Sequence, residues 1–100
     1  MTRITNRAHV LVAYDIADDK RRTRVFKTLR DFGNHVQYSV FLCELDPRET
    51  IRLRHLLRAE INHAEDQVMF VHVGPATHSV EEQLEVHGIP YSPPGRQMVV

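Results

Sequence analysis

The chain has 100 residues, of which 42% are hydrophobic, and it carries 13 basic and 13 acidic side chains. This length predicts one domain with a small core, which dimer formation would help to stabilise. No apolar run approaches the roughly eighteen residues of a membrane helix and no secretory signal is visible, so we expect a cytoplasmic protein without membrane contact. Its single cysteine, Cys43, excludes an internal disulfide and is expected to be a core residue.

The first predicted element is a buried strand, Ala8 to Asp15, that is apolar until it ends in a carboxylate. A helix follows from Asp19 to Phe32, capped by Asp18 or Asp19, with an apolar stripe at helical spacing. Gly33 is expected to close this helix in the left-handed conformation.

Residues 35–45 are rich in β-branched and aromatic side chains and are predicted to be extended. They form either a hairpin of two short strands or one strand with a bulge, and the sequence leaves both open. Asp46, Pro47 and Glu49 are typical of a capped helix start, so a second helix should run to about Asn62 or His63. Residues 67–73 are a further strand, which Gly74-Pro75 ends.

With a hairpin in the middle, the order is βαββαβ, an α+β ferredoxin-like fold with both helices on one sheet face. The other face stays open for a partner. We assign residues 1–75 to this core domain and residues 76–100 to a C-terminal extension. The extension should hold a short helix, Val80 to His87, with a capping box at Ser79 and a closing Gly88. Residues 97–100 would be an extra edge strand, suited to pairing with the second subunit of a homodimer.

Asp15 is the sharpest candidate for chemistry, because it stands where a buried strand leaves the fold. A carboxylate there suits Mg²⁺, which is often held by one or two carboxylates together with substrate phosphate. The alternative is an Asp that only accepts N–H bonds in a turn. The seven histidines lack the close spacing of a zinc site.

Basic residues concentrate on the two predicted helices, although the net charge is zero. Arg21 and Arg22 follow Asp15 by about two helical turns, where their forked guanidinium groups suit a phosphate. The alternative is a solvated helix face. On a continuous strand, Ser39 and Phe41 would face the same side.

Four motifs then point to a family: YD at 14–15, DDKRR at 18–22, FG at 32–33 and QYSVF at 37–41, with Glu65-Asp66 before the last strand. In this order and spacing they resemble the small CRISPR-associated endonuclease of the adaptation module, the Cas-two family. The resemblance covers about Val10 to Val73, and His87 to Tyr91 adds a weaker match.

The resemblance implies a homodimer in which the C-terminal strand crosses to the partner. It implies metal-dependent cleavage of RNA or DNA phosphodiesters, with Asp15 as catalytic residue and metal ligand. We expect one Mg²⁺ shared by Asp15 of both subunits, because a pair of carboxylates holds the ion better than one. The resemblance also implies nucleic-acid-binding residues, namely Arg21, Arg22 and Arg24. It implies supporting or interface residues as well, namely Tyr14, Ser39 and Phe41.

The same resemblance implies that the dimer bridges two dimers of the CRISPR integrase during spacer acquisition. A non-catalytic nucleic-acid-binding bridge is therefore the alternative function, with Asp15 as a structural cap. A small-molecule regulatory module on the same fold is a weaker alternative, since no glycine-rich ligand loop is present.

Overall fold

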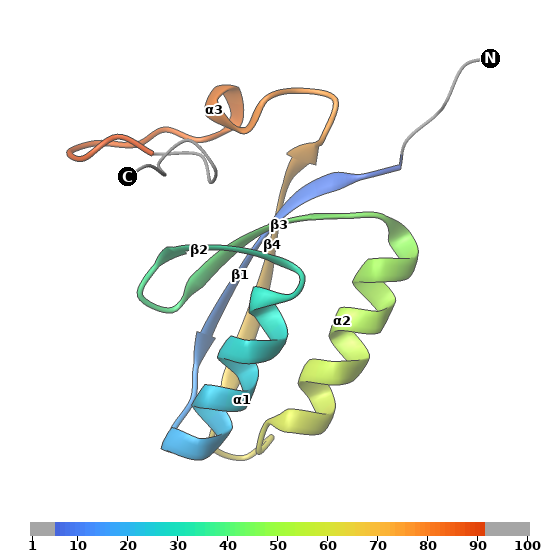
Figure 1. Ribbon diagram of the computed structural model, residues 1–100, viewed down its shortest axis with the longest axis vertical. Coiled ribbons are helices and arrows are strands. Elements are labelled where there is room, and N and C mark those ends of the chain that lie inside the picture. Colours follow the sequence, from blue (N-terminus) through green and yellow to red (C-terminus); the bar gives the residue numbers. More distant parts are fainter. Residues whose placement is uncertain (1–5, 92–100) are drawn as a thin grey trace.

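A computed structural model describes residues 6–91 of the chain. Four strands, β1 (Ala8–Asp15), β2 (Gly33–Gln37), β3 (Val40–Leu45) and β4 (Gln67–Pro75), form one sheet. Their order is β2-β3-β1-β4, and every neighbouring pair is antiparallel. Helices α1 (Asp19–Arg30) and α2 (Pro47–Glu60) lie side by side on one face of this sheet (Figure 1). The predicted ferredoxin-like βαββαβ fold is confirmed.

The sheet has one covered face and one open face. In β1 the buried side chains alternate with less buried ones, and Val10 and Val12 point to the helices. They meet Phe41 of β3 and join Leu29 of α1 and Leu53 of α2 in one core cluster. On the opposite face, β4 leaves its apolar side chains exposed, with Met69 50% and Val71 45% accessible.

The middle of the chain is a hairpin, β2 and β3, with a register shift between His35 and Gln37. Gly33 does not close α1 in the left-handed conformation, since Gly88 is the only described residue with positive φ. It starts β2, where a Cβ would lie 2.5 Å from the Cys43 sulfur and 2.6 Å from the Leu42 carbonyl oxygen. Close approach of two strands therefore explains this glycine. The core location of Cys43 is confirmed, and burial raises the pKa of its thiol to about 11.

Both helices end two or more residues before the predicted ends, while their starts are as expected. Asp18 caps α1 through the N–H of Arg21, and Asp46 forms the predicted capping box with Glu49. Helix α2 stops at Glu60, because the chain then turns through Asn62, whose backbone N–H donates to Asp66.

The segment after β4 contains one short helix, α3 (Val80–Gln83), rather than the predicted helix to His87. The expected cap is absent, since the Ser79 side chain makes no cap hydrogen bond. Gln83 instead accepts a hydrogen bond in a 2.7 Å contact with His9 Nδ1 of β1 and donates to the Pro75 carbonyl, which fastens α3 beside the sheet. The predicted strand 97–100 lies outside the described residues. No helix within 6–91 is long and apolar enough to cross a membrane.

Candidate active site

Asp15 is the last residue of β1 and lies opposite Gln67 of β4. Strand alternation places its side chain on the open face of the sheet, with Ala13 and Leu11. The residue is exposed, and within residues 6–91 its carboxylate makes no hydrogen bond or ion pair. The alternative interpretation, an aspartate that only accepts backbone N–H bonds in a turn, is therefore wrong for Asp15. Both of its carboxylate oxygens stay accessible to a ligand.

A single copy of the described chain supplies few metal ligands at this point. Within residues 6–91, no three side chains of the His, Cys, Asp and Glu types gather closely enough to hold an ion together. Mg²⁺ prefers oxygen donors, keeps several waters and is commonly bound by one or two carboxylates plus substrate phosphate. The donor chemistry of Asp15 fits this ion, with the remaining positions left to water, substrate or a second carboxylate.

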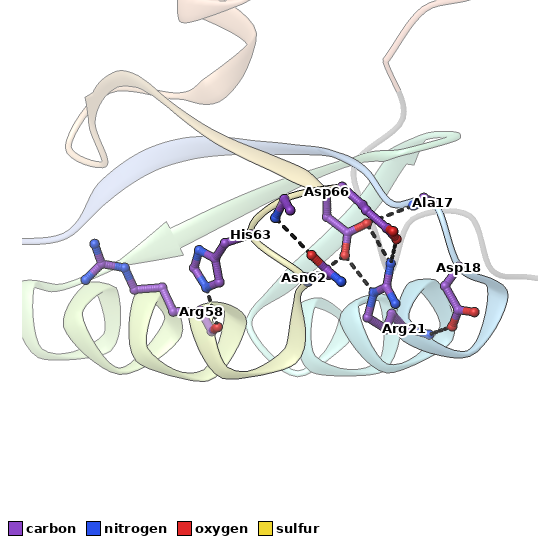
Figure 2. Close-up of polar contacts among 9 residues, drawn as sticks. Ala17, Asp18, Arg21, Arg58, Asn62, His63 and Asp66 are labelled. Atoms are coloured by element: carbon purple, nitrogen blue, oxygen red, sulfur yellow. Dashed lines mark hydrogen bonds and ion pairs between the residues drawn. The ribbon is translucent and has the colours of Figure 1, made fainter.

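The turn after Asp15 is fixed by a buried carboxylate, that of Asp66, at the start of the last strand (Figure 2). Its side chain has no exposed surface and accepts backbone N–H bonds from Ala17 at 2.9 Å and Asn62 at 2.8 Å. The Arg21 guanidinium approaches it with both Nε, at 2.7 Å, and Nη2, at 3.1 Å. Arg21 Nη2 also lies 3.0 Å from Glu65. We refer to Ala17, Arg21, Asn62, Glu65 and Asp66 as the Asp66 cluster.

The electrostatics of the Asp66 cluster keep it ionised. The Arg21 side chain, followed by the two backbone N–H groups, holds the pKa of Asp66 well below its usual range. In return the Asp66 carboxylate, with Glu65, raises the pKa of Arg21. The cluster joins the β1–α1 turn to the α2–β4 loop, so it fixes the backbone two residues beyond Asp15.

The three predicted nucleic-acid-binding arginines have different surroundings. Arg21 is committed to Asp66 and Glu65, which leaves it poorly placed for a phosphate. Arg22 pairs with Asp19, an aspartate in the first turn of α1 whose side chain is 95% exposed. Arg24 is exposed and, in the described part of the chain, forms no hydrogen bond or ion pair. Arg22 and Arg24 therefore remain available to nucleic acid.

The predicted supporting residues lie near one another, Tyr14 in β1 and Ser39 and Phe41 in different parts of the hairpin. Phe41 is fully buried in the core, whereas Ser39 is in the β2–β3 turn, so the two do not share a strand face. The Ser39 carbonyl accepts the backbone N–H of Tyr14 at 3.1 Å. Tyr14 and Ser39 line a hollow of about 420 Å³ between α1 and the hairpin, and Arg22 and Tyr38 also line it.

Two features of this region were not assigned from the sequence. The role of Asp66 depends on contacts between segments more than forty residues apart, and the only sequence signal was an acidic pair before a strand. Tyr38 is 84% exposed at the hairpin turn. The sequence predicted an extended segment here, either two short strands or one strand with a bulge, and neither possibility specified how exposed Tyr38 would be.

Comparison with known proteins agrees with this fold. The family described as CRISPR associated protein Cas2 matches residues 8–79. The chain is 38% identical over 90 residues to a CRISPR-associated endoribonuclease Cas2 of Geobacter sulfurreducens, covering 90% of this chain and 94% of the relative. It is 45% identical over 76 residues to a Rhodospirillum rubrum protein with the same designation, over 75% of this chain and 74% of the relative.

Solved structures give the same result. A hypothetical protein from Thermus thermophilus superposes with a TM-score of 0.73 at 35% identity, covering 83% of this chain and 93% of its own. Cas2 of Streptococcus pyogenes superposes with a TM-score of 0.69 at 32% identity, covering 80% and 99%. The family predicted from the four motifs is therefore confirmed, and the chain belongs to the CRISPR-associated Cas2 family.

Proposed function

We propose that this chain is a Mg²⁺-dependent endoribonuclease of the CRISPR adaptation module, with Asp15 as its metal ligand and catalytic carboxylate. The observation that carries the proposal is the state of Asp15: an exposed carboxylate without an intramolecular partner in the described chain, on a turn that the Asp66 cluster holds in place. The curated relatives, which are named endoribonucleases, support the reaction class.

The functional unit is a homodimer that packs through the open face of the sheet. Met69 and Val71 expose apolar surface there, and such surface on a small protein favours association. Asp15 belongs to the same face, so a two-fold axis near the end of β1 brings two copies of Asp15 together. Two carboxylates then face one site, which adds a donor to the few that residues 6–91 of one copy supply there.

The chain's own residues would act by holding and orienting the substrate. Asp15 binds the ion through its free oxygens, and the cluster bond from Ala17 to Asp66 keeps the turn from moving away. Arg22 and Arg24 lie in the first turns of the following helix and neutralise backbone phosphates. Mg²⁺, when bound at Asp15, would supply the electrophilic chemistry, namely polarisation of the phosphate and a lowered pKa of its bound water.

The test is Asp15→Asn, which keeps the shape of the side chain and removes its charge. We expect cleavage of single-stranded RNA to fall by about 100-fold or more, because an ion that stabilises charge contributes several kcal/mol. Asp31→Asn, an exposed aspartate at the far end of α1, is the matched control and should cleave normally. An Asp15→Asn protein that cleaves like the unchanged protein would overturn the catalytic role.

A second function, a nucleic-acid-binding bridge between integrase dimers, is supported by the outer face of α2. Arg48, Arg52, Arg54 and Arg58 are all exposed on this helix. Arg52 lies over the Phe32 ring at 5.7 Å and Arg54 over the Phe70 ring at 5.8 Å, which holds both guanidinium groups against the surface. Spacer acquisition by the same Asp15→Asn protein separates the functions. Intact acquisition without cleavage assigns bridging to the fold and cleavage to Asp15.

A further inference from the structure

A hollow of about 420 Å³ lies between α1 and the β2–β3 hairpin, on the helix side of the strand end that carries Asp15. Its wall includes Tyr14, Arg22, Phe26, His35, Tyr38 and Ser39. We propose that this hollow binds one unstacked nucleotide of single-stranded RNA and so selects the strand to be cut. The inference rests on the proposed function, which it extends by naming how the substrate is held.

Tyr14 is the first indication of a ligand. The residue is only 7% exposed, yet its hydroxyl makes no hydrogen bond within residues 6–91. It is also absent from the buried unsatisfied atoms of the described chain, so the hydroxyl is open to the hollow rather than enclosed. A tyrosine hydroxyl that opens into a hollow in this way can hydrogen-bond to the polar edge of a ligand bound there.

The second indication is an aromatic wall on the hairpin. Tyr38 is 84% exposed, and its carbonyl is 3.0 Å from His35 Nε2, which steadies the turn. The His35 ring packs on Phe41 at 4.9 Å and meets Phe26 edge-on at 5.2 Å. Exposed aromatic rings on a fixed base are the usual platforms on which single-stranded nucleic acids stack their bases.

The third indication is charge. Burial is the main cause of the raised pKa of Tyr14, with Tyr38 adding to it and Arg22 opposing it, so both head groups lie within electrostatic reach of that hydroxyl. Within residues 6–91, Arg22 pairs only with Asp19, whose side chain is 95% exposed and is free to turn to solvent. A phosphate can therefore take over the guanidinium without leaving a buried carboxylate unpaired.

These three features together specify the ligand. An aromatic platform suits a base, the Tyr14 hydroxyl suits its polar edge, and Arg22 suits the attached phosphate. The volume falls in the range of sites for single small molecules, so a base must leave its stack to enter, which a base-paired duplex opposes. Tyr14 directly precedes Asp15, but their side chains are on opposite faces of β1, so an RNA held in the hollow would pass around the end of this strand to reach Asp15.

The test is equilibrium binding of a labelled single-stranded RNA to the full chain in EDTA, where no metal-dependent cleavage takes place. We expect Tyr38→Ala to weaken binding about tenfold and Tyr14→Phe, which removes only the hydroxyl, about threefold. An RNA of the same length with abasic positions should bind the unchanged protein about tenfold more weakly than the intact RNA does. Tyr38→Ala should bind this abasic RNA with the same affinity as the unchanged protein, because no base is left to stack on Tyr38. Tyr38 is exposed, so its loss should leave the fold intact, as thermal unfolding will verify.

Ile89→Ala is the matched control, since Ile89 is an equally exposed apolar side chain, at 89%, outside the hollow. The nucleotide site would be overturned if the unchanged protein bound the intact and the abasic RNA equally well. It would also be overturned if Tyr38→Ala bound the intact RNA as tightly as the unchanged protein does. That result leaves cleavage through Asp15 standing. Conversely, base-dependent binding with no cleavage by the unchanged protein would overturn the proposed nuclease and retain the site.

Discussion

Two polar regions border the first turns of α1, namely the Asp66 cluster and the hollow beside the hairpin. Two adjacent arginines divide between them. Arg21 enters the Asp66 cluster, where the buried carboxylate receives two backbone N–H bonds and a two-pronged guanidinium contact. Arg22 lines the hollow beside the hairpin, where the Tyr14 hydroxyl has no hydrogen-bond partner in the described chain. The first region is satisfied by the chain itself, and the second is not.

This difference separates stability from function in a small domain. A buried polar group with all its partners holds two loops together, and its loss leaves other groups unpaired. A polar group that faces an open hollow contributes little to folding and is free to bind substrate. The two regions therefore predict opposite results for stability and for RNA binding.

The largest expected effect comes from Asp66→Ala. The change leaves the Ala17 and Asn62 N–H groups without their acceptor and leaves the Arg21 side chain, which is only 19% exposed, without its main partner. We expect the midpoint of thermal unfolding to fall on the order of 5–10 °C, as for the loss of a largely buried pair in a small domain. Glu65→Ala, at an exposed position of the same cluster, should change it little. An Asp66→Ala protein as stable as the unchanged one would show that the cluster is not structural.

The next effect is that the stability difference between the unchanged protein and Asp66→Ala depends on pH. The pKa of Asp66 in the folded protein is lowered, chiefly by the Arg21 side chain. The pKa of Asp18 is lowered as well, chiefly by the backbone N–H of Arg21. A group with a lowered folded pKa contributes stability above its unfolded pKa, about 4 for an aspartate, and loses it as the pH falls further. The stability gap between the unchanged protein and Asp66→Ala, measured by urea unfolding, should be constant from pH 5 to 8 and should narrow below about pH 4. A gap that widens on acidification would contradict this assignment.

Features that depend on residues close together in the sequence were predicted, and features that depend on contacts between distant segments were missed. Helix starts were predictable because caps such as Asp46 and Glu49 lie within one turn of each other. Helix ends were less so, since α2 stops where Asn62 donates to Asp66, a contact made by the following loop. The predicted role of Gly33 as a left-handed helix end was wrong. Its close contact with Cys43 exists only once two strands pair, so the sequence did not reveal it.

The candidate site divides in the same way. The position of Asp15 at the end of a strand was predictable from an apolar run that ends in a carboxylate, and the motifs around it identified the family. The separate roles of Arg21 and Arg22 were not, because they are neighbours in sequence and differ only in what each meets across the fold. The exposure of Tyr38 depends on the hairpin turn, which the sequence left as one of two possibilities.

The smallest expected effect comes from exchanging each of these arginines for lysine, which keeps the charge and removes the fork. Arg21→Lys loses the two-pronged contact with Asp66 and should lower the midpoint of unfolding by roughly 3 °C, less than Asp66→Ala. Arg22→Lys disturbs only an exposed pair and should change the midpoint by less than about 1 °C. For RNA binding in EDTA the order reverses, with a loss at Arg22→Lys of about threefold and no change at Arg21→Lys, because only Arg22 faces the hollow. Equal effects of the two exchanges on both measurements would show that the chain does not distinguish these neighbours, and the division between the two regions would fail.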